Sequence, residues 1–168
     1  MSMGNEQKVF KVLENLSISF IKHEHPPVFT VDQAEKYWTS IKGIHCKNLF
    51  LRNKKGNRHY LLILESSKQA DLKSLTKLLG EDRLSFASAE RLMRCLGLEA
   101  GAVSPFGLIN DDKNTVRILI DQDLKNAESV CFHPNVNTAT LELSFNDFER
   151  FLAWCGNSIR YIQIEKVL

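Results

Sequence analysis

The chain has 168 residues, which indicates a single domain over 1–168, and it is 43% hydrophobic and 25% charged, as in an ordinary globular protein. The net charge of +2 is too small to favour any partner by itself. No apolar run reaches about 18 residues and no signal-peptide segment opens the chain, so a membrane span is excluded and the cytoplasm is the expected compartment.

A helix, a strand and a second helix are predicted at the start of the chain. Residues 5–16 carry apolar side chains at helical spacing, and residues 17–23 alternate like a strand. Two consecutive prolines then exclude a helix. Thr30 and Gln33 have the spacing of a capping box, so the second helix is expected to begin at Val31.

A β-hairpin and two short helices are predicted in the middle of the chain. The apolar runs 48–53 and 58–65 flank a turn in which Gly56 can supply a positive φ angle. The helices are expected where apolar residues at helical spacing precede a glycine that can cap the last turn, at 71–80 and 88–97.

The remaining segments are predicted to be mainly strands. Segment 99–110 contains Gly, Ser and Pro and is expected to be a loop. Ser144 and Asp147 have the spacing of a cap before an amphipathic helix. The strands are expected at 84–88, 115–121, 129–135, 138–144 and 159–165.

These elements amount to about seven strands and five helices, mixed along the chain. Strict alternation of strand and helix fails because two hairpins interrupt it. The predicted class is therefore α/β or α+β, with a mixed sheet.

Positive charge is concentrated in residues 36–58, which contain seven lysines or arginines and no acid. Such a tract can steer a polyanion such as nucleic acid. The alternative is a solvated hairpin tip that happens to be basic. The basic residues are Lys36, Lys42, Lys47, Arg52, Lys54, Lys55 and Arg58.

No metal or redox site is predicted. The cysteines are far apart and include no C-x-x-C pair, so they are expected to be reduced and at least partly buried. His23 and His25 would face the same side of a strand and could both bind a metal, but no third ligand is evident nearby. The four cysteines are Cys46, Cys95, Cys131 and Cys155.

The sequence lacks the usual signatures of hydrolases, nucleotide-binding proteins and metalloenzymes. Lys47 and Asn48 offer donors and an acceptor that suit a phosphate or a polarised ester, although a strand edge with a solvated lysine is the more ordinary explanation of this pair alone. In the loop from Gly101 to Gly107, backbone N–H groups could form an oxyanion site. His133 ends a strand, where it is either functional or a hydrogen-bonded structural residue.

Four segments together resemble one family. They occur in the order, and at roughly the separations, of the prolyl-tRNA editing domain superfamily of the YbaK/ProX type. The resemblance covers roughly residues 5–160 and is greatest to the free-standing alanyl-tRNA(Pro) deacylases, also described as prolyl-tRNA synthetase-associated domains. The segments are "HPPVFTVDQA", "GIHCKNLFLRNKKG", "GLEAGAVSPFGLIND" and "FHPNVNTATLELS".

The resemblance implies a mixed, partly barrel-like sheet flanked by helices. It also implies hydrolysis, in trans, of the ester that joins alanine to tRNA(Pro), without a metal or organic cofactor. The expected partner is the acceptor end of the tRNA, with prolyl-tRNA synthetase as a second candidate, and the oligomeric state stays open.

The resemblance also implies the site residues. Those expected to act in catalysis are Lys47, Asn48, Gly101, Pro105 and His133. Those expected to contact the substrate are Phe29, Thr30, Ser104, Phe132 and Asn135. Those expected to contact the tRNA backbone are Lys36, Lys42, Arg52, Lys54, Lys55 and Arg58.

In the mechanism that the resemblance implies, water attacks the ester while loop N–H groups and Lys47 hold it. The terminal ribose hydroxyl of the tRNA assists, and no side chain acts as a general base. Asn135 stands where the family usually has an apolar residue, so the accepted amino acid stays open. The alternatives are a deacylase of the same fold for cysteinyl-tRNA(Pro) or another mischarged tRNA, and a non-catalytic module that binds tRNA or the synthetase.

Overall fold

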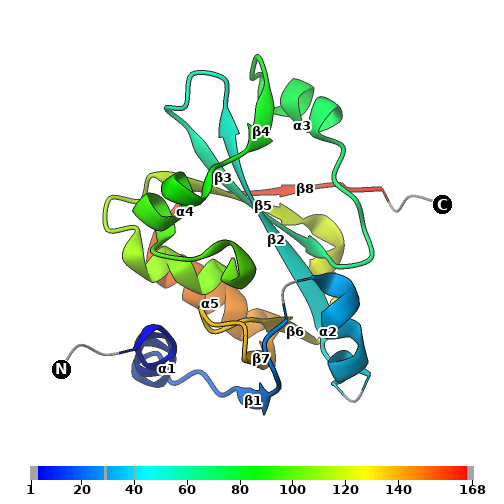
Figure 1. Cartoon of the computed structure of the whole chain (residues 1–168), viewed down its shortest axis with the longest axis vertical. Coiled ribbons are helices and arrows are strands. Elements are labelled where there is room, and N and C mark those ends of the chain that lie inside the picture. Colours follow the sequence, from blue (N-terminus) through cyan, green and yellow to red (C-terminus); the bar gives the residue numbers. More distant parts are fainter. Residues whose placement is uncertain (1–3, 29, 40, 166–168) are drawn as a thin grey trace.

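The computed structural model describes residues 4–28, 30–39 and 41–165, and for Val31 only the backbone (Figure 1). The helices are α1 (Asn5–Asn15), α2 (Val31–Trp38), α3 (Leu72–Leu79), α4 (Ala89–Leu96) and α5 (Phe145–Cys155), and the 3₁₀ helices are η1 (Ala100–Ala102), η2 (Pro105–Asn110) and η3 (Gln122–Asn126). The strands are β1 (Ile21–Glu24), β2 (Ile44–Asn53), β3 (His59–Glu65), β4 (Leu84–Phe86), β5 (Val116–Asp121), β6 (Ser129–Phe132), β7 (Ala139–Ser144) and β8 (Ile159–Ile162). Within these ranges no helix has the length and apolar character to cross a membrane.

Three helix ends lie where the capping residues predicted them. The Thr30 hydroxyl accepts a hydrogen bond from the Gln33 N–H, so α2 begins at Val31 as expected. The Ser144 hydroxyl does the same for the Asp147 N–H at the start of α5. Helix α3 ends at Leu79 and is capped by Gly80, whose φ of 68° is the left-handed conformation that a glycine C-cap supplies.

Several boundaries differ from the prediction; for example, β2 begins at Ile44 rather than at residue 48, and β8 ends at Ile162 rather than at residue 165. Three of the differences have a clear local reason. Residues 17–18 do not begin β1, because Ser17 has a φ of 56° and the Ile18 N–H bonds back to Leu13, which closes α1. Strand β6 ends at Phe132 because a turn follows it, with φ at 63° in Asn135. The predicted loop 99–110 is wrong in part, since it contains η1 and η2.

The strands form one mixed sheet in the order β1-β7-β6-β2-β3-β5-β8, with β4 beside β2. Strands β2 and β3 form one antiparallel hairpin, and β6 and β7 form the other. The parallel pairs are β2 with β6, β3 with β5, and β5 with β8. The mixed sheet is therefore confirmed, and β1 and β8 are its two ends.

Apolar side chains cover both faces of this sheet. Along β3, Leu61 and Ile63 face a large cluster that includes α1, α4 and α5, while Leu62 and Leu64 face a smaller cluster beneath α3. Burial on both faces explains why β3 is almost continuously apolar. Figure 1 shows α4 and α5 on one side of the sheet and α3 on the other.

Strand β2 changes partners along its length, and this change creates an opening. Ile44 and His45 pair with Val130 and Cys131 of β6, and the last residues of β2 pair with β4. Between them, the described residues place no strand on the second edge of β2 at 46–50. Since β2 and β6 run parallel, their carboxyl-terminal sides part here, and such crevices commonly bind ligands.

Candidate active site

A cavity of about 150 Å³ occupies the opening between β2 and β6. It brings together five of the residues predicted for the site, which come from four separate segments of the sequence. Its volume lies below the usual range of drug-sized ligand pockets, so a small group fits it best. The lining residues are Val28, Thr30, Ala34, Trp38, Cys46, Lys47, Asn48, Ala100, Gly101, Val103 and His133.

Lys47 places an ammonium group at this cavity. It lies two residues after His45, the last residue of β2 that pairs with β6, and it pairs with Leu64 of β3. Burial lowers the pKa of Lys47, because desolvation disfavours the charged form. No ion pair among the described residues includes Lys47, so its donors are available to an anionic or strongly polar ligand.

Asn48 links β2 to the segment between η1 and η2. Its Nδ2 donates to the Val103 carbonyl oxygen at 3.3 Å. Its Oδ1 is buried and has no hydrogen-bond partner among the described residues. A buried acceptor without a partner is costly, and a ligand that donates a hydrogen bond would remove that cost.

His133 presents a neutral imidazole to the cavity. Its Nδ1 donates to the Ala139 carbonyl oxygen at 2.9 Å, which leaves Nε2 as an acceptor. Burial lowers the pKa of His133, and the nearby His25 lowers it further, although the bond to Ala139 opposes both effects. The ring can therefore accept a hydrogen bond from a hydroxyl or ammonium group at neutral pH.

Helix α2 supplies part of the cavity wall. Ala34 and Trp38 are one helical turn apart and so share a face, and Thr30 caps the same helix. The Trp38 ring stacks on His45, with centroids 4.1 Å apart and planes 12° apart. Burial lowers the pKa of His45 to about 4, so this ring is neutral and Trp38 rests on an uncharged surface.

The chain matches the family described as the aminoacyl-tRNA editing domain over residues 25–151. It belongs to that family. It is 40% identical to the "Prolyl-tRNA editing protein ProX" of Acetoanaerobium sticklandii, over 98% of this chain and 100% of that protein. It is 34% identical to the "Prolyl-tRNA synthetase associated domain-containing protein 1" of Bos taurus, over 85% of each chain. The same fold occurs in a solved structure that is provisionally described as a trans-editing enzyme for prolyl tRNA synthetase, with a TM-score of 0.73. The two chains are 20% identical, and the match covers 99% of this chain and 100% of that one.

Some residues predicted for the site lie outside the cavity between β2 and β6. Ser104 is fully buried, and its hydroxyl accepts from the Phe106 N–H at the start of η2. Pro105 is buried in the same turn. Phe132 packs against Phe106 and Phe148 in the core. Asn135 lines a neighbouring cavity that shares Gly101. Phe29 lies outside the described residues.

The sequence reasoning missed the apolar wall of the cavity between β2 and β6. Ala34 and Trp38 line the cavity, as do Val28 and Val103. The helical spacing of Thr30, Ala34 and Trp38 was the available signal, because positions four apart share one face. That spacing does not reveal which strand the face meets.

The basic tract of the editing domain divides into two groups at opposite ends of β2. Lys36 and Lys42 are exposed near the cavity, and Lys36 lies over the Tyr37 ring. The second group lies at the hairpin tip, and from Lys47 to Arg52 the strand covers about 17 Å at ~3.3 Å per residue. The residues of this second group are Arg52, Lys54, Lys55 and Arg58.

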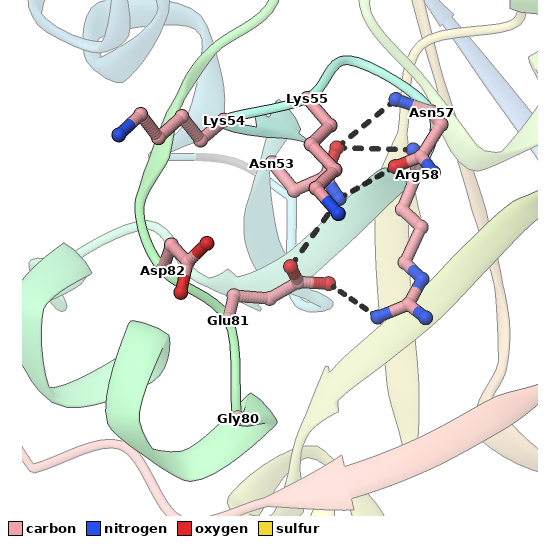
Figure 2. A pocket seen from close by; sticks show the side chains of 8 residues that line it. All are labelled: Asn53, Lys54, Lys55, Asn57, Arg58, Gly80, Glu81 and Asp82. Atoms are coloured by element: carbon pink, nitrogen blue, oxygen red, sulfur yellow. Dashed lines mark hydrogen bonds and ion pairs between the residues drawn. The ribbon is translucent and has the colours of Figure 1, made fainter.

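Acidic side chains partly neutralise the hairpin tip, as Figure 2 shows. Glu81, which precedes β4, accepts hydrogen bonds from Asn53 at 3.3 Å and from Arg58 at 3.2 Å. It also accepts a bond of 2.6 Å from the Tyr60 hydroxyl. Arg52 donates to carbonyl groups of its own turn. This network holds the hairpin against the α3–β4 turn, while Lys54 and Lys55 remain exposed.

The two histidines considered as metal ligands have protein partners. His23 Nε2 lies 3.2 Å from Glu142 Oε1, and His25 Nε2 lies 2.9 Å from the Thr140 hydroxyl. Within the described part of the chain, no three metal-binding side chains come together.

Proposed function

We propose that the chain is a trans-editing deacylase that hydrolyses the ester of a mischarged tRNA(Pro), with alanyl-tRNA(Pro) as its substrate. The observation that carries the proposal is the small cavity in which an unpaired ammonium, a neutral histidine and an amide acceptor converge. Membership of the editing family and the likeness to a prolyl-tRNA editing protein support it.

The lining of the cavity favours attack by water over covalent catalysis. Cys46 is the thiol in the lining, and its Sγ donates to the Ile44 carbonyl oxygen at 3.6 Å. Burial raises the pKa of that thiol well above its usual value, so it is a poor nucleophile. An aminoacyl ester is already activated, and water can attack it once its carbonyl is polarised and held.

The side chains then have distinct roles. Lys47 binds the phosphate of the terminal nucleotide or the ester oxygen, and backbone N–H groups between Gly101 and Ser104 stabilise the developing oxyanion. One such donor contributes roughly 3–4 kcal/mol. The Ala102 N–H is not among these donors, because it already donates to the Glu99 carbonyl oxygen at 3.0 Å. His133 Nε2 accepts from the substrate ammonium or the ribose hydroxyl, and Asn48 Oδ1 accepts from the ammonium or the attacking water.

The apolar wall of the cavity favours a small side chain such as that of alanine. A synthetase site built for proline rejects the smaller alanine weakly, because each methylene changes binding by only about 1–3 kcal/mol. A second site that is too small for proline removes the error after charging. Val28, Ala34 and Trp38 provide the apolar wall that limits its size.

A deacylation assay with three esters tests the proposal. The purified chain is mixed with alanyl-, cysteinyl- and prolyl-tRNA(Pro), and the loss of each labelled amino acid is followed over the uncatalysed rate. We expect rapid loss of alanine and slow loss of proline. Faster loss of cysteine would show that cysteinyl-tRNA(Pro), and not alanyl-tRNA(Pro), is the substrate. Binding of tRNA without loss of any ester would show that the chain is a non-catalytic binding module.

A further inference from the structure

A second cavity, of about 370 Å³, adjoins the first at Gly101. It lies between the residues that precede α2, the η1 segment and the turn after β6, with Pro27, Glu99 and Asn135 among its lining. Its larger volume suits a planar ring better than a small side chain. The two cavities share a residue without a side chain, so one ligand can extend across the Gly101 backbone into both.

Asn135 lines this second cavity and carries an unused hydrogen-bond acceptor. The residue is only 4% exposed, and its Oδ1 has no hydrogen-bond partner among the described residues. The turn around it is fixed, since the Val28 N–H bonds to the Asn137 carbonyl at 3.2 Å and the His25 N–H to the Thr138 carbonyl at 3.0 Å. Buried polar groups are nearly always paired, so the unused acceptor indicates a ligand that donates a hydrogen bond.

The polar groups of the lining indicate what kind of ligand this is. Asn5 and Asn137 add carboxamides, and Glu99 adds a carboxylate, which accepts hydrogen bonds only. The lining residues include no lysine or arginine, so a phosphate group is a poor occupant. Amide and carboxylate groups are the side chains that read the amino-bearing edges of adenine and cytosine.

We propose that the second cavity binds the terminal adenine of the tRNA whose ester occupies the first cavity, with Asn135 Oδ1 accepting from the exocyclic amino group. The proposal rests on the proposed function, because it takes the substrate to be a tRNA aminoacylated at its 3′ end. The base and the ester-bearing hydroxyl are attached to different sides of the ribose. With the base in one cavity and the ester in the other, the ribose therefore lies between them, over Gly101. Asn135 thereby positions the ester without touching the reacting atoms.

Binding of non-hydrolysable substrate analogues tests this inference independently of hydrolysis. The probes are 3′-alanylamido-3′-deoxyadenosine and the same compound built on purine riboside, which lacks the exocyclic amino group. We expect the purine analogue to bind about tenfold more weakly, the effect of one lost hydrogen bond. Equal affinities would overturn the inference, whereas tight adenosine binding without cleavage of any tRNA ester would overturn the proposed function alone.

The variant Asn135→Gly identifies the group responsible. Glycine suits the φ of 63° at this position, so the fold is expected to survive, and the thermal unfolding midpoint checks it. We expect Asn135→Gly to bind the adenosine analogue about tenfold more weakly and the purine analogue unchanged. An equal loss for both analogues would overturn the role of Asn135. Asn114→Gly, at an exposed position with φ at 54° that lines neither cavity, is the matched control.

Discussion

Lys68 is expected to be the side chain on which the C-terminal part of the sheet depends most. Its Nζ donates to Asp121 at 3.0 Å, to Asp123 at 2.6 Å and to the Ile164 carbonyl oxygen at 2.9 Å. These bonds join the segment after β3 to the end of β5 and to the chain beyond β8. Burial opposes the charge of Lys68, but the two carboxylates outweigh it and raise the pKa of the ammonium.

Lys68→Met removes the charge while keeping the length of the side chain. Asp121 is fully buried, so the variant leaves an uncompensated carboxylate in the interior. Breaking a buried ion pair in this way costs about 3–5 kcal/mol. In a domain of this size each kcal/mol lowers the melting temperature by about 2–4 °C, so the expected decrease is roughly 6–20 °C.

Urea unfolding followed by circular dichroism measures the free energy of unfolding for Lys68→Met. Lys77→Met on α3 is the matched control, because Lys77 is exposed and belongs to no ion pair among the described residues. Asp123→Asn is expected to have a smaller effect than Lys68→Met, since the Asp123 side chain is 49% exposed. A loss below about 1 kcal/mol for Lys68→Met, the range of surface pairs, would refute the reasoning.

Two further predictions concern the site and one helix. Burial lowers the pKa of His133 below its usual 6.5, so the neutral form of the ring persists in more acidic solution. We therefore expect kcat/KM for deacylation to stay level from pH 8 to 6.5 and to decline only below pH 6.5. A decline with its midpoint at or above pH 6.5 would contradict a neutral His133. Ser144→Ala should lower the free energy of unfolding by about 1 kcal/mol, because the hydroxyl caps α5, and an unchanged urea midpoint would show that this cap contributes nothing.

Local signals predicted the elements of this fold well. Thr30, Ser144 and Gly80 occupy the cap positions that their chemistry indicates, because capping depends only on residues within one or two turns. The apolar run of β3 also predicted a strand. The end of β6 was missed because the turn at Asn135, with its positive φ, carries no glycine.

The site was predicted less completely because it depends on contacts between distant segments. The motif segments supplied Lys47, Asn48, Gly101 and His133, which the fold brings to one cavity. Phe132 was predicted as well, but it precedes His133 in an extended segment, where successive side chains point in opposite directions. His133 therefore faces the cavity whereas Phe132 packs in the core, and the sequence alone does not tell which of the two points inward.

The apolar wall illustrates the same difficulty. Trp38 becomes part of the site because α2 lies across the opening between β2 and β6. That opening exists because β2 exchanges β6 for β4 as its neighbour. Strand order is set by the packing of the whole domain, so no local pattern around Trp38 could reveal it.

The most direct test of the account compares single-turnover hydrolysis of alanyl-tRNA(Pro) by the unmodified chain and by Lys47→Ala. Lys113→Ala, at an exposed position outside the cavity, is the control. The account predicts a loss of about a hundredfold or more for Lys47→Ala, the effect of removing a charge-stabilising donor, and normal hydrolysis by the control. Near-normal hydrolysis by a folded Lys47→Ala variant would contradict the account, because the ammonium at the cavity would then have no part in the reaction.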